Sequence, residues 1–164
     1  MAIREILLLG NSRLYEMCEP VKREELPILV PVVQDLHDTL MDFKQRYGAG
    51  RAIAALQIGV AKRLVYMHID HPVVFINPEV DQKSQEMIAL WDDCMCFPDL
   101  LVKVERHQRC RITYRDKEWK ERTMALEGDL SELLQHECDH LEGILAVSRA
   151  LDKFSFALRS KKKL

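Results

Sequence analysis

The feature that most constrains the fold is a short polar cluster inside a helical stretch near the end of the chain. Residues 130–147 read LSELLQHECDHLEGILAV, in which His136 and His140 lie four positions apart and Glu137 follows the first of them. On an α-helix, residues i and i+4 share one face, so both imidazoles can reach a single metal ion. The same letters also fit an ordinary solvated helix. If the two histidines bind a metal ion, the rest of the chain must pack around this helix.

Length and composition limit what such a site can belong to. The chain has 164 residues, 48% of them apolar, so we expect one domain over 1–164 with a real core. Its 24 basic and 26 acidic side chains are scattered, which argues against a nucleic-acid surface, and we expect 160–164 to be a frayed basic tail. The sequence predicts neither an export signal nor a membrane span, and its five cysteines therefore predict reduced thiols in a cytosolic protein.

Hydrophobic periodicity predicts an α+β fold. Residues 31–47 place apolar side chains at helical spacing between a proline and Gly48, which predicts an N-terminal amphipathic helix. Short runs then predict mostly antiparallel strands joined as hairpins, at residues 64–69, 73–77, 86–91, 100–105, 109–115 and 118–126. A second helix is expected to begin near Asp129, capped by that residue with Glu132 in a capping box, and to end at Gly143. We expect the strands to pack around this second helix.

The two histidines need a third partner, because a catalytic metal takes three protein ligands and leaves one position open. Glu137 is too close to His136 to be an easy ligand, but it is well placed to accept a proton from water at the site. Free cysteines are commonly small buried hydrophobes, and histidines beside a turn are commonly surface residues. From the residues alone the third ligand stays open among Cys94, Cys96, His68, His71, His107 and the acidic side chains.

Three segments, in order along the chain, resemble the signature motifs of one metalloenzyme family. Residues 50–57, GRAIAALQ, resemble G-φ-G-φ-A-A-x-Q, in which φ is apolar. Residues 92–98, DDCMCFP, resemble E-G-C-φ-S-x-P, and residues 135–143, QHECDHLEG, match Q-H-E-x-D-H-φ-x-G in full. Weaker similarity extends over roughly residues 3–150. On these motifs the chain resembles the peptide deformylases, which remove the formyl group from the N-terminal methionine of new bacterial and organellar proteins.

The resemblance implies a metal-dependent hydrolase that releases formate from N-formyl-methionyl peptides or nascent chains. It implies a bacterial cytoplasmic or organellar location, with the ribosome as a further partner. It also implies that Cys94 joins His136 and His140 as ligands of one divalent ion. This ion is usually Fe(II) in the family, and Zn, Ni or Co can substitute for it.

The resemblance also assigns the catalytic groups. It implies that Glu137 is the general acid and base, and that the developing oxyanion is met by the Gln57 amide and the backbone N–H of Met95. Asp92 stands where the family has a glutamate that braces the site, and Arg106 lies on the strand expected beside it. We therefore predict an ion pair between Asp92 and Arg106, direct or through one water, that holds the Cys94 loop.

The chain departs from the family's motifs at positions expected to lie near the substrate. Arg51 replaces an apolar residue and Ala52 replaces the second glycine, where the substrate backbone is expected to pair with the enzyme. Asp93 and Cys96 replace a glycine and a serine. These departures leave the implied ligands, base and amide in place, so they concern the substrate and not the chemistry.

The predicted second helix contributes to the same region. Helical spacing places Asp129, Glu132 and Leu133 on the face of His136, from which relatives partly line the pocket for the methionine side chain. The two acids either make this pocket more polar or only cap and solvate the helix. The predicted substrate-binding residues are Arg51, Ala52, Glu132 and Leu133.

Other functions stay open. A related N-acyl or small-formamide hydrolase with the same metal centre is favoured by the departures in the first two motifs. A metal-binding partner module without catalysis is disfavoured, because Glu137 and Gln57 are intact. A zinc endoprotease is less consistent with the sequence, because its third ligand normally follows the helix and residues 144–164 offer only Asp152.

Overall fold

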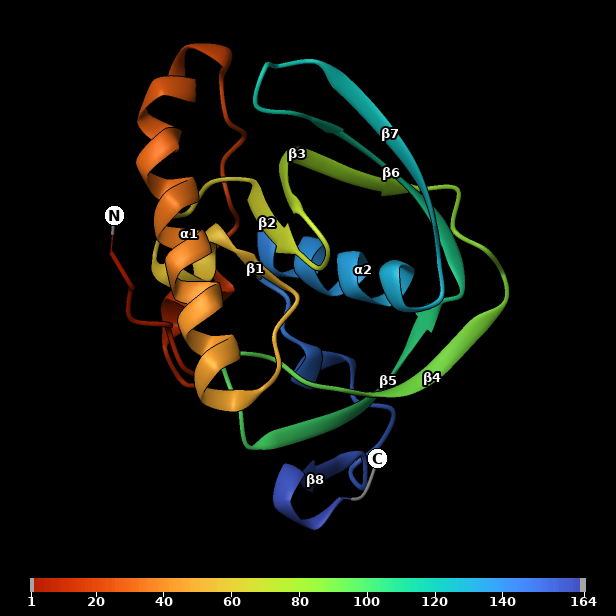
Figure 1. The fold of residues 1–164 in the computed structure, drawn as a ribbon. Helices are drawn as coiled ribbons and strands as arrows, with labels where there is room; N and C mark the ends of the chain where they lie inside the picture. The colour runs from red at the N-terminus through yellow and green to blue at the C-terminus, as the bar shows by residue number, and fades with distance from the viewer. Residues whose placement is uncertain (1, 163–164) are drawn as a thin grey trace.

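The computed structural model describes residues 2–162, and its architecture confirms the α+β prediction. Figure 1 shows helix α2 (Asp129–Leu141) at the centre, strands on either side of it, and the longer helix α1 (Leu26–Tyr47) along one flank. α2 contacts strands of both sheets, so the helix with the two histidines is the element around which the others pack. The strands are β1 (Ala52–Ala54), β2 (Leu64–His68), β3 (Pro72–Asp81), β4 (Met87–Asp92), β5 (Leu100–His107), β6 (Arg109–Arg115), β7 (Glu121–Glu127) and β8 (Phe156–Leu158).

Within residues 2–162 the strands pair antiparallel in two sheets. One sheet has the order β1-β2-β3-β6-β7 and the other the order β4-β5-β8. β4 and β5 form a hairpin in which Asp92, the last residue of β4, lies opposite Val102. The loop between them therefore starts at the edge of the central helix and carries the cysteines of the second motif.

The N-terminal amphipathic helix is longer than the sequence predicted. α1 begins at Leu26 instead of Pro31, because Pro27 occupies the first turn, where a missing N–H leaves no helical hydrogen bond unmade. Pro31 lies inside the helix and removes one backbone hydrogen bond, which the burial of Leu29 in the extra turn helps to offset. The predicted end is confirmed, since Gly48 adopts φ 67° directly after the last turn.

α2 lies close to its predicted bounds, but no side chain caps its N-terminus. Gly128, with φ 59°, precedes the helix and Asp129 is its first residue, so the predicted Asp129 cap is wrong. This backbone conformation suits glycine, and the Glu132 side chain is bonded elsewhere. Gly143 follows the helix with φ 71°, and a Cβ there would collide with the carbonyl oxygen of Tyr15. The N-terminal arm therefore lies directly against the end of α2.

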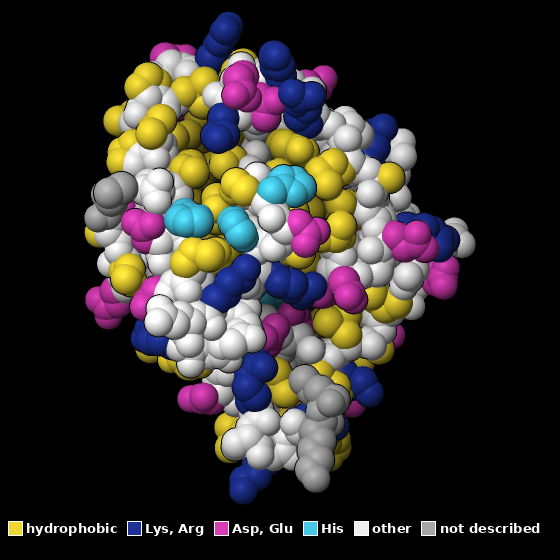
Figure 2. Space-filling view, viewed as in Figure 1, with side chains coloured by type: hydrophobic (Ala, Val, Ile, Leu, Met, Phe, Trp, Pro, Cys, Tyr) yellow, Lys and Arg dark blue, Asp and Glu magenta, His cyan; other side chains and the backbone are white. Residues whose placement is uncertain are grey.

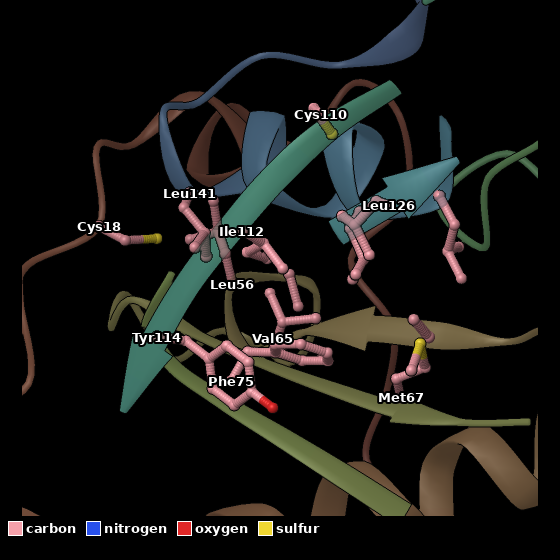
Figure 3. Packing of buried hydrophobic residues seen from close by; sticks show 14 residues of the cluster. Cys18, Leu56, Val65, Met67, Phe75, Cys110, Ile112, Tyr114, Leu126 and Leu141 are labelled. Atoms are coloured by element: carbon pink, nitrogen blue, oxygen red, sulfur yellow. The ribbon is translucent and has the colours of Figure 1, made fainter. Parts of the chain in front are cut away.

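The main hydrophobic core fixes α2 against the five-stranded sheet. Figure 3 shows Leu141 from the helix packed in one cluster with Phe75 of β3 and Ile112 of β6, and all three are fully buried. A second cluster joins α1 to β1 and β2. Truncating a buried leucine in such a core costs about 2–5 kcal/mol. The side chains on the opposite face of α2 are thus held on a rigid element.

Two short strands were not predicted from the sequence. β1 and β8 have three residues each, too few to show the alternation that predicts a strand. In the region of the expected frayed tail, 160–164, Arg159–Lys161 forms a 3-10 helix without a buried residue, and Lys162 Nζ lies 4.3 Å from the centre of the Trp91 ring. Residues 163–164 lie outside the described part of the chain. No described helix has the length and apolar character needed to span a bilayer.

Candidate metal centre and active site

Three predicted ligands meet beside the central helix. Cys94 lies in the loop after β4, and His136 and His140 come from adjacent turns of α2. Their ligand atoms all lie within 4.8 Å of one another, and Cys94 Sγ is 3.4 Å from His140 Nε2. All three side chains are buried. One sulfur and two imidazole nitrogens at this spacing suit a divalent transition metal with an open fourth position, so the residues fit such an ion.

A buried ion-pair network orients the first histidine. His136 Nδ1 is 2.8 Å from Asp92 Oδ2, which leaves Nε2 as its ligand atom. Arg106 donates to Asp92 at 3.1 Å and to Asp139 at 2.6 Å, and Arg149 donates to Asp139 at 2.8 Å. The ion pair predicted between Asp92 and Arg106 is therefore confirmed as a direct contact. It continues through Asp139 to the half-exposed Arg149 at the surface.

The charges of this network set the protonation of the ligands. Burial raises the pKa of the Asp92 carboxyl, but His136 and Arg106 lower it to about 2. Burial lowers the pKa of His136, whereas Asp92 raises it to about 9. The pKa of His140 lies well below its usual range because of burial and the neighbouring His136. Burial raises the pKa of the Cys94 thiol well above its usual value. A cation must displace protons from Cys94 and His136, so higher pH favours its binding.

Glu137 places a carboxyl group in the same pocket as the ligands. The residue is buried, and its Oε2 atom has no hydrogen-bond partner among residues 2–162. Burial raises the pKa of this carboxyl to about 7, against the opposing effect of His136. A carboxyl group that titrates near neutral pH can both accept and return a proton, which is the property expected of a general acid and base.

The Gln57 amide is fixed beside the sulfur ligand. Its Oε1 accepts a hydrogen bond from the Ala54 backbone N–H at 2.8 Å, which directs Nε2 toward Cys94 Sγ at 3.8 Å and Cys96 Sγ at 3.4 Å. Met95 lies between the two cysteines and lines the pocket. Cys96 is not part of the ligand group, but its backbone N–H faces Cys94 Sγ at 3.5 Å. The Gln57 amide therefore lies beside the sulfur ligand and the loop that carries it.

A pocket of about 320 Å³ opens beside the ligands and contains two ion pairs in its walls. Arg51 Nη2 is 2.6 Å from Glu132 Oε1, and Arg159 Nη2 is 2.6 Å from Asp93 Oδ2. Figure 2 shows basic and acidic side chains gathered around a hollow near the centre of the molecule. The pocket lining includes every residue predicted to bind substrate: Arg51, Ala52, Glu132 and Leu133.

Other residues weighed from the sequence lie elsewhere, and some pocket residues were missed, among them Phe43 and Arg159. Asp129 is exposed and is not part of the pocket lining. Phe43 lines the pocket although its spacing indicated only the apolar face of α1, and Arg159 reaches it because β8 pairs with β5. No local pattern around Arg159 could have indicated this. Within the described chain, the metal-ligand group does not include His68, His71 or His107.

Comparison with known proteins identifies the family. The polypeptide deformylase model matches residues 3–155. A peptide deformylase of Rhizobium meliloti is 34% identical over 90% of this chain and 84% of the relative, and peptide deformylase 2 of Ralstonia nicotianae is 36% identical over 94% and 92%. The crystal structure of peptide deformylase from Thermotoga maritima has a TM-score of 0.85 at 27% identity, covering 93% of this chain and 100% of that one. This chain therefore belongs to the peptide deformylase family and is a metal-dependent hydrolase of formylated peptides.

Proposed function

We propose that Cys94, His136 and His140 hold one divalent ion, natively Fe(II), with Zn, Ni or Co able to replace it. The support is a mixed sulfur and nitrogen donor set whose atoms lie within 4.8 Å of one another. When bound, such an ion supplies a Lewis acid that polarises the formyl carbonyl and makes water at the site more acidic. Asp92 keeps the His136 ring in the orientation that this role needs.

Glu137 carries the protons of the reaction. Its carboxylate accepts a proton from the attacking water and delivers it to the amide nitrogen as the bond from that nitrogen to the formyl carbon breaks. The products are formate and a free N-terminal amine. The proposal is supported by the buried position of Glu137, the unpartnered Oε2 and a pKa raised to about 7.

The Gln57 amide and the Met95 backbone N–H stabilise the oxyanion that forms on the formyl oxygen. Gln57 suits this role because the Ala54 N–H already occupies its Oε1, so its Nε2 is directed at the site before substrate arrives. Donors fixed in advance lose no energy to reorganisation during the reaction. Met95 directly follows the sulfur ligand and lines the pocket, which supports this role for its backbone N–H.

The substrate is a peptide or nascent chain that begins with formyl-methionine, in a bacterial cytoplasm or an organelle, and the ribosome is a partner. β1 is an edge strand of its sheet within the described chain, and an extended peptide backbone can pair with such an edge beside Ala52. Arg51, Glu132 and Leu133 then meet the first side chain. We also infer that residues 1–164 act as a single domain.

The convergence of three ligands beside Glu137 is the observation that carries this proposal. The test is formate release from formyl-Met-Ala-Ser by enzyme loaded with Fe(II) under anaerobic, reducing conditions. Acetyl-Met-Ala-Ser is the matched substrate, and we expect no comparable release of acetate. Turnover of the acetyl peptide at a similar rate would favour a broader N-acyl hydrolase, and absence of turnover with both peptides would favour a metal-binding module without catalysis.

A further inference from the structure

An ion pair occupies the wall of the pocket where the first side chain of the substrate is expected. Glu132 lies one turn before the ligand His136 on α2, and its side chain is only 7% exposed. Its Oε1 accepts a hydrogen bond from Arg51 Nη2 at 2.6 Å. Arg51 directly precedes β1, so the pair connects the ligand helix to the edge strand. A side chain that enters this pocket must contact a guanidinium group, a carboxylate or both.

The rest of the lining combines a second ion pair with apolar groups. Asp93 is bonded to Arg159 at 2.6 Å and also acts electrostatically on Arg51, so acids and cations alternate along this wall and their formal charges cancel. Apolar surface comes from further lining residues, among them Phe43, Ala52 and Leu133. The pocket therefore offers apolar contact for a methylene stem and hydrogen-bonding partners for a polar end.

The lining of the pocket favours some substrate side chains over others according to their polarity and charge. A purely apolar side chain displaces water from the Arg51–Glu132 pair and returns no hydrogen bond, which carries a desolvation cost. A charged side chain competes with one member of the pair: an anion displaces Glu132, which is 7% exposed, and a cation displaces Arg51, which is 40% exposed. A primary amide can donate to the carboxylate and accept from the guanidinium at once. An uncharged polar end therefore fits the wall better than an apolar or a charged one.

We propose that the Arg51–Glu132 pair is a specificity determinant that extends the substrates to formyl peptides whose first side chain is polar and uncharged, of the glutamine class. The inference rests on the proposed function, because it concerns the side chain next to the same formyl group. It predicts that formyl-Gln peptides are hydrolysed at least as efficiently as peptides with an unbranched apolar side chain of similar length.

The test compares kcat/KM for formyl-Gln-Ala-Ser and formyl-norleucine-Ala-Ser on the same Fe(II)-loaded preparation. The ratio of the two values is independent of how much enzyme is folded or loaded. We expect a ratio of one or more in the wild type and a fall of about 10- to 100-fold in the double variant Arg51→Leu/Glu132→Leu, the range that corresponds to losing a hydrogen bond to a charged group. The double replacement leaves neither charge buried without its partner.

Arg111→Leu is the matched control, because Arg111 of β6 forms an exposed pair with Asp81 at the end of β3, and Arg111 does not line the pocket. Its ratio should equal that of the wild type. A ratio well below one in the wild type, or a ratio unchanged in the double variant, would overturn the specificity inference while leaving deformylation intact. Absence of formate from every formyl peptide, formyl-Met-Ala-Ser included, would instead refute the proposed function.

Discussion

Glu137 is surrounded by charges of both signs. Asp92 and Glu132 raise the pKa of its carboxyl and His136 and Arg51 lower it, but burial has the largest effect and brings the value to about 7. A divalent cation at the adjacent ligands displaces the protons of Cys94 and His136, so its binding leaves the formal charge beside Glu137 unchanged. A carboxyl group with a pKa of about 7 exchanges its proton at neutral pH, so Glu137 can both accept a proton and return it.

Replacing Glu137 with glutamine keeps the size of the side chain and removes its basicity. We expect formate release from formyl-Met-Ala-Ser to fall by about 100-fold or more, the contribution typical of a positioned general acid and base. Metal content per chain, measured by elemental analysis, should equal that of the wild type because Glu137 is not a ligand. Turnover close to the wild-type rate at full metal loading would show that another group carries the proton.

The two cysteines of the second motif should behave differently when they are replaced. Cys94 belongs to the ligand group and Cys96 does not, although both thiols face the Gln57 amide. Cys94→Ala should abolish tight metal binding, whereas Cys96→Ser should retain one ion per chain. An X-ray absorption spectrum of the wild type should show one sulfur and two nitrogen ligands from the protein. Two sulfur ligands, or loss of the ion in Cys96→Ser, would contradict this assignment.

The buried ion-pair network connects two elements of the fold, the β4–β5 hairpin and the ligand helix α2. Asp92 ends β4, Arg106 lies on β5, and His136 and Asp139 lie on α2. Arg106 contacts both acids and its side chain is only 3% exposed. Since Cys94 follows Asp92 by two residues, this contact also determines where the sulfur ligand sits relative to the histidines.

Removing the Arg106 guanidinium should therefore loosen the metal site. We expect Arg106→Ala to weaken metal affinity by about 10- to 100-fold, as is usual when the support of a ligand is lost. Competition with a chelator measures this affinity. The control is Arg111→Ala, whose exposed pair with Asp81 contributes about 1 kcal/mol or less to stability and should leave the affinity unchanged. An affinity for Arg106→Ala equal to that of the control would refute the bracing role.

Across the whole molecule, what could be predicted depended on whether the signal was local. The i, i+4 spacing of His136 and His140 is a property of one helix, so it placed both on one face before any tertiary contact was known. The Asp92–Arg106 pair was predicted from the resemblance, which places a bracing carboxylate at Asp92, together with the strand expected beside it. Arg159 was missed because its position depends on β8 pairing with β5 across a long stretch of chain. The prediction that Asp129 caps α2 was wrong because Gly128 precedes the helix in a backbone conformation that residue spacing does not predict.

The buried network also predicts how acid affects the stability of the metal-free protein. The pKa of Asp92 is about 2 in the folded state and 3.8 ordinarily, so its stabilising effect is present above 3.8 and is lost as pH falls through about 2. The difference corresponds to about 2 kcal/mol. We expect Asp92→Asn to unfold in less urea than the wild type at pH 5, after both are stripped with a chelator. The gap in unfolding free energy should narrow by about 2 kcal/mol toward pH 2, because the wild-type carboxyl is then protonated. A difference in unfolding free energy that stays constant from pH 5 to pH 2 would mean that His136 and Arg106 do not lower the pKa of the buried Asp92 carboxyl.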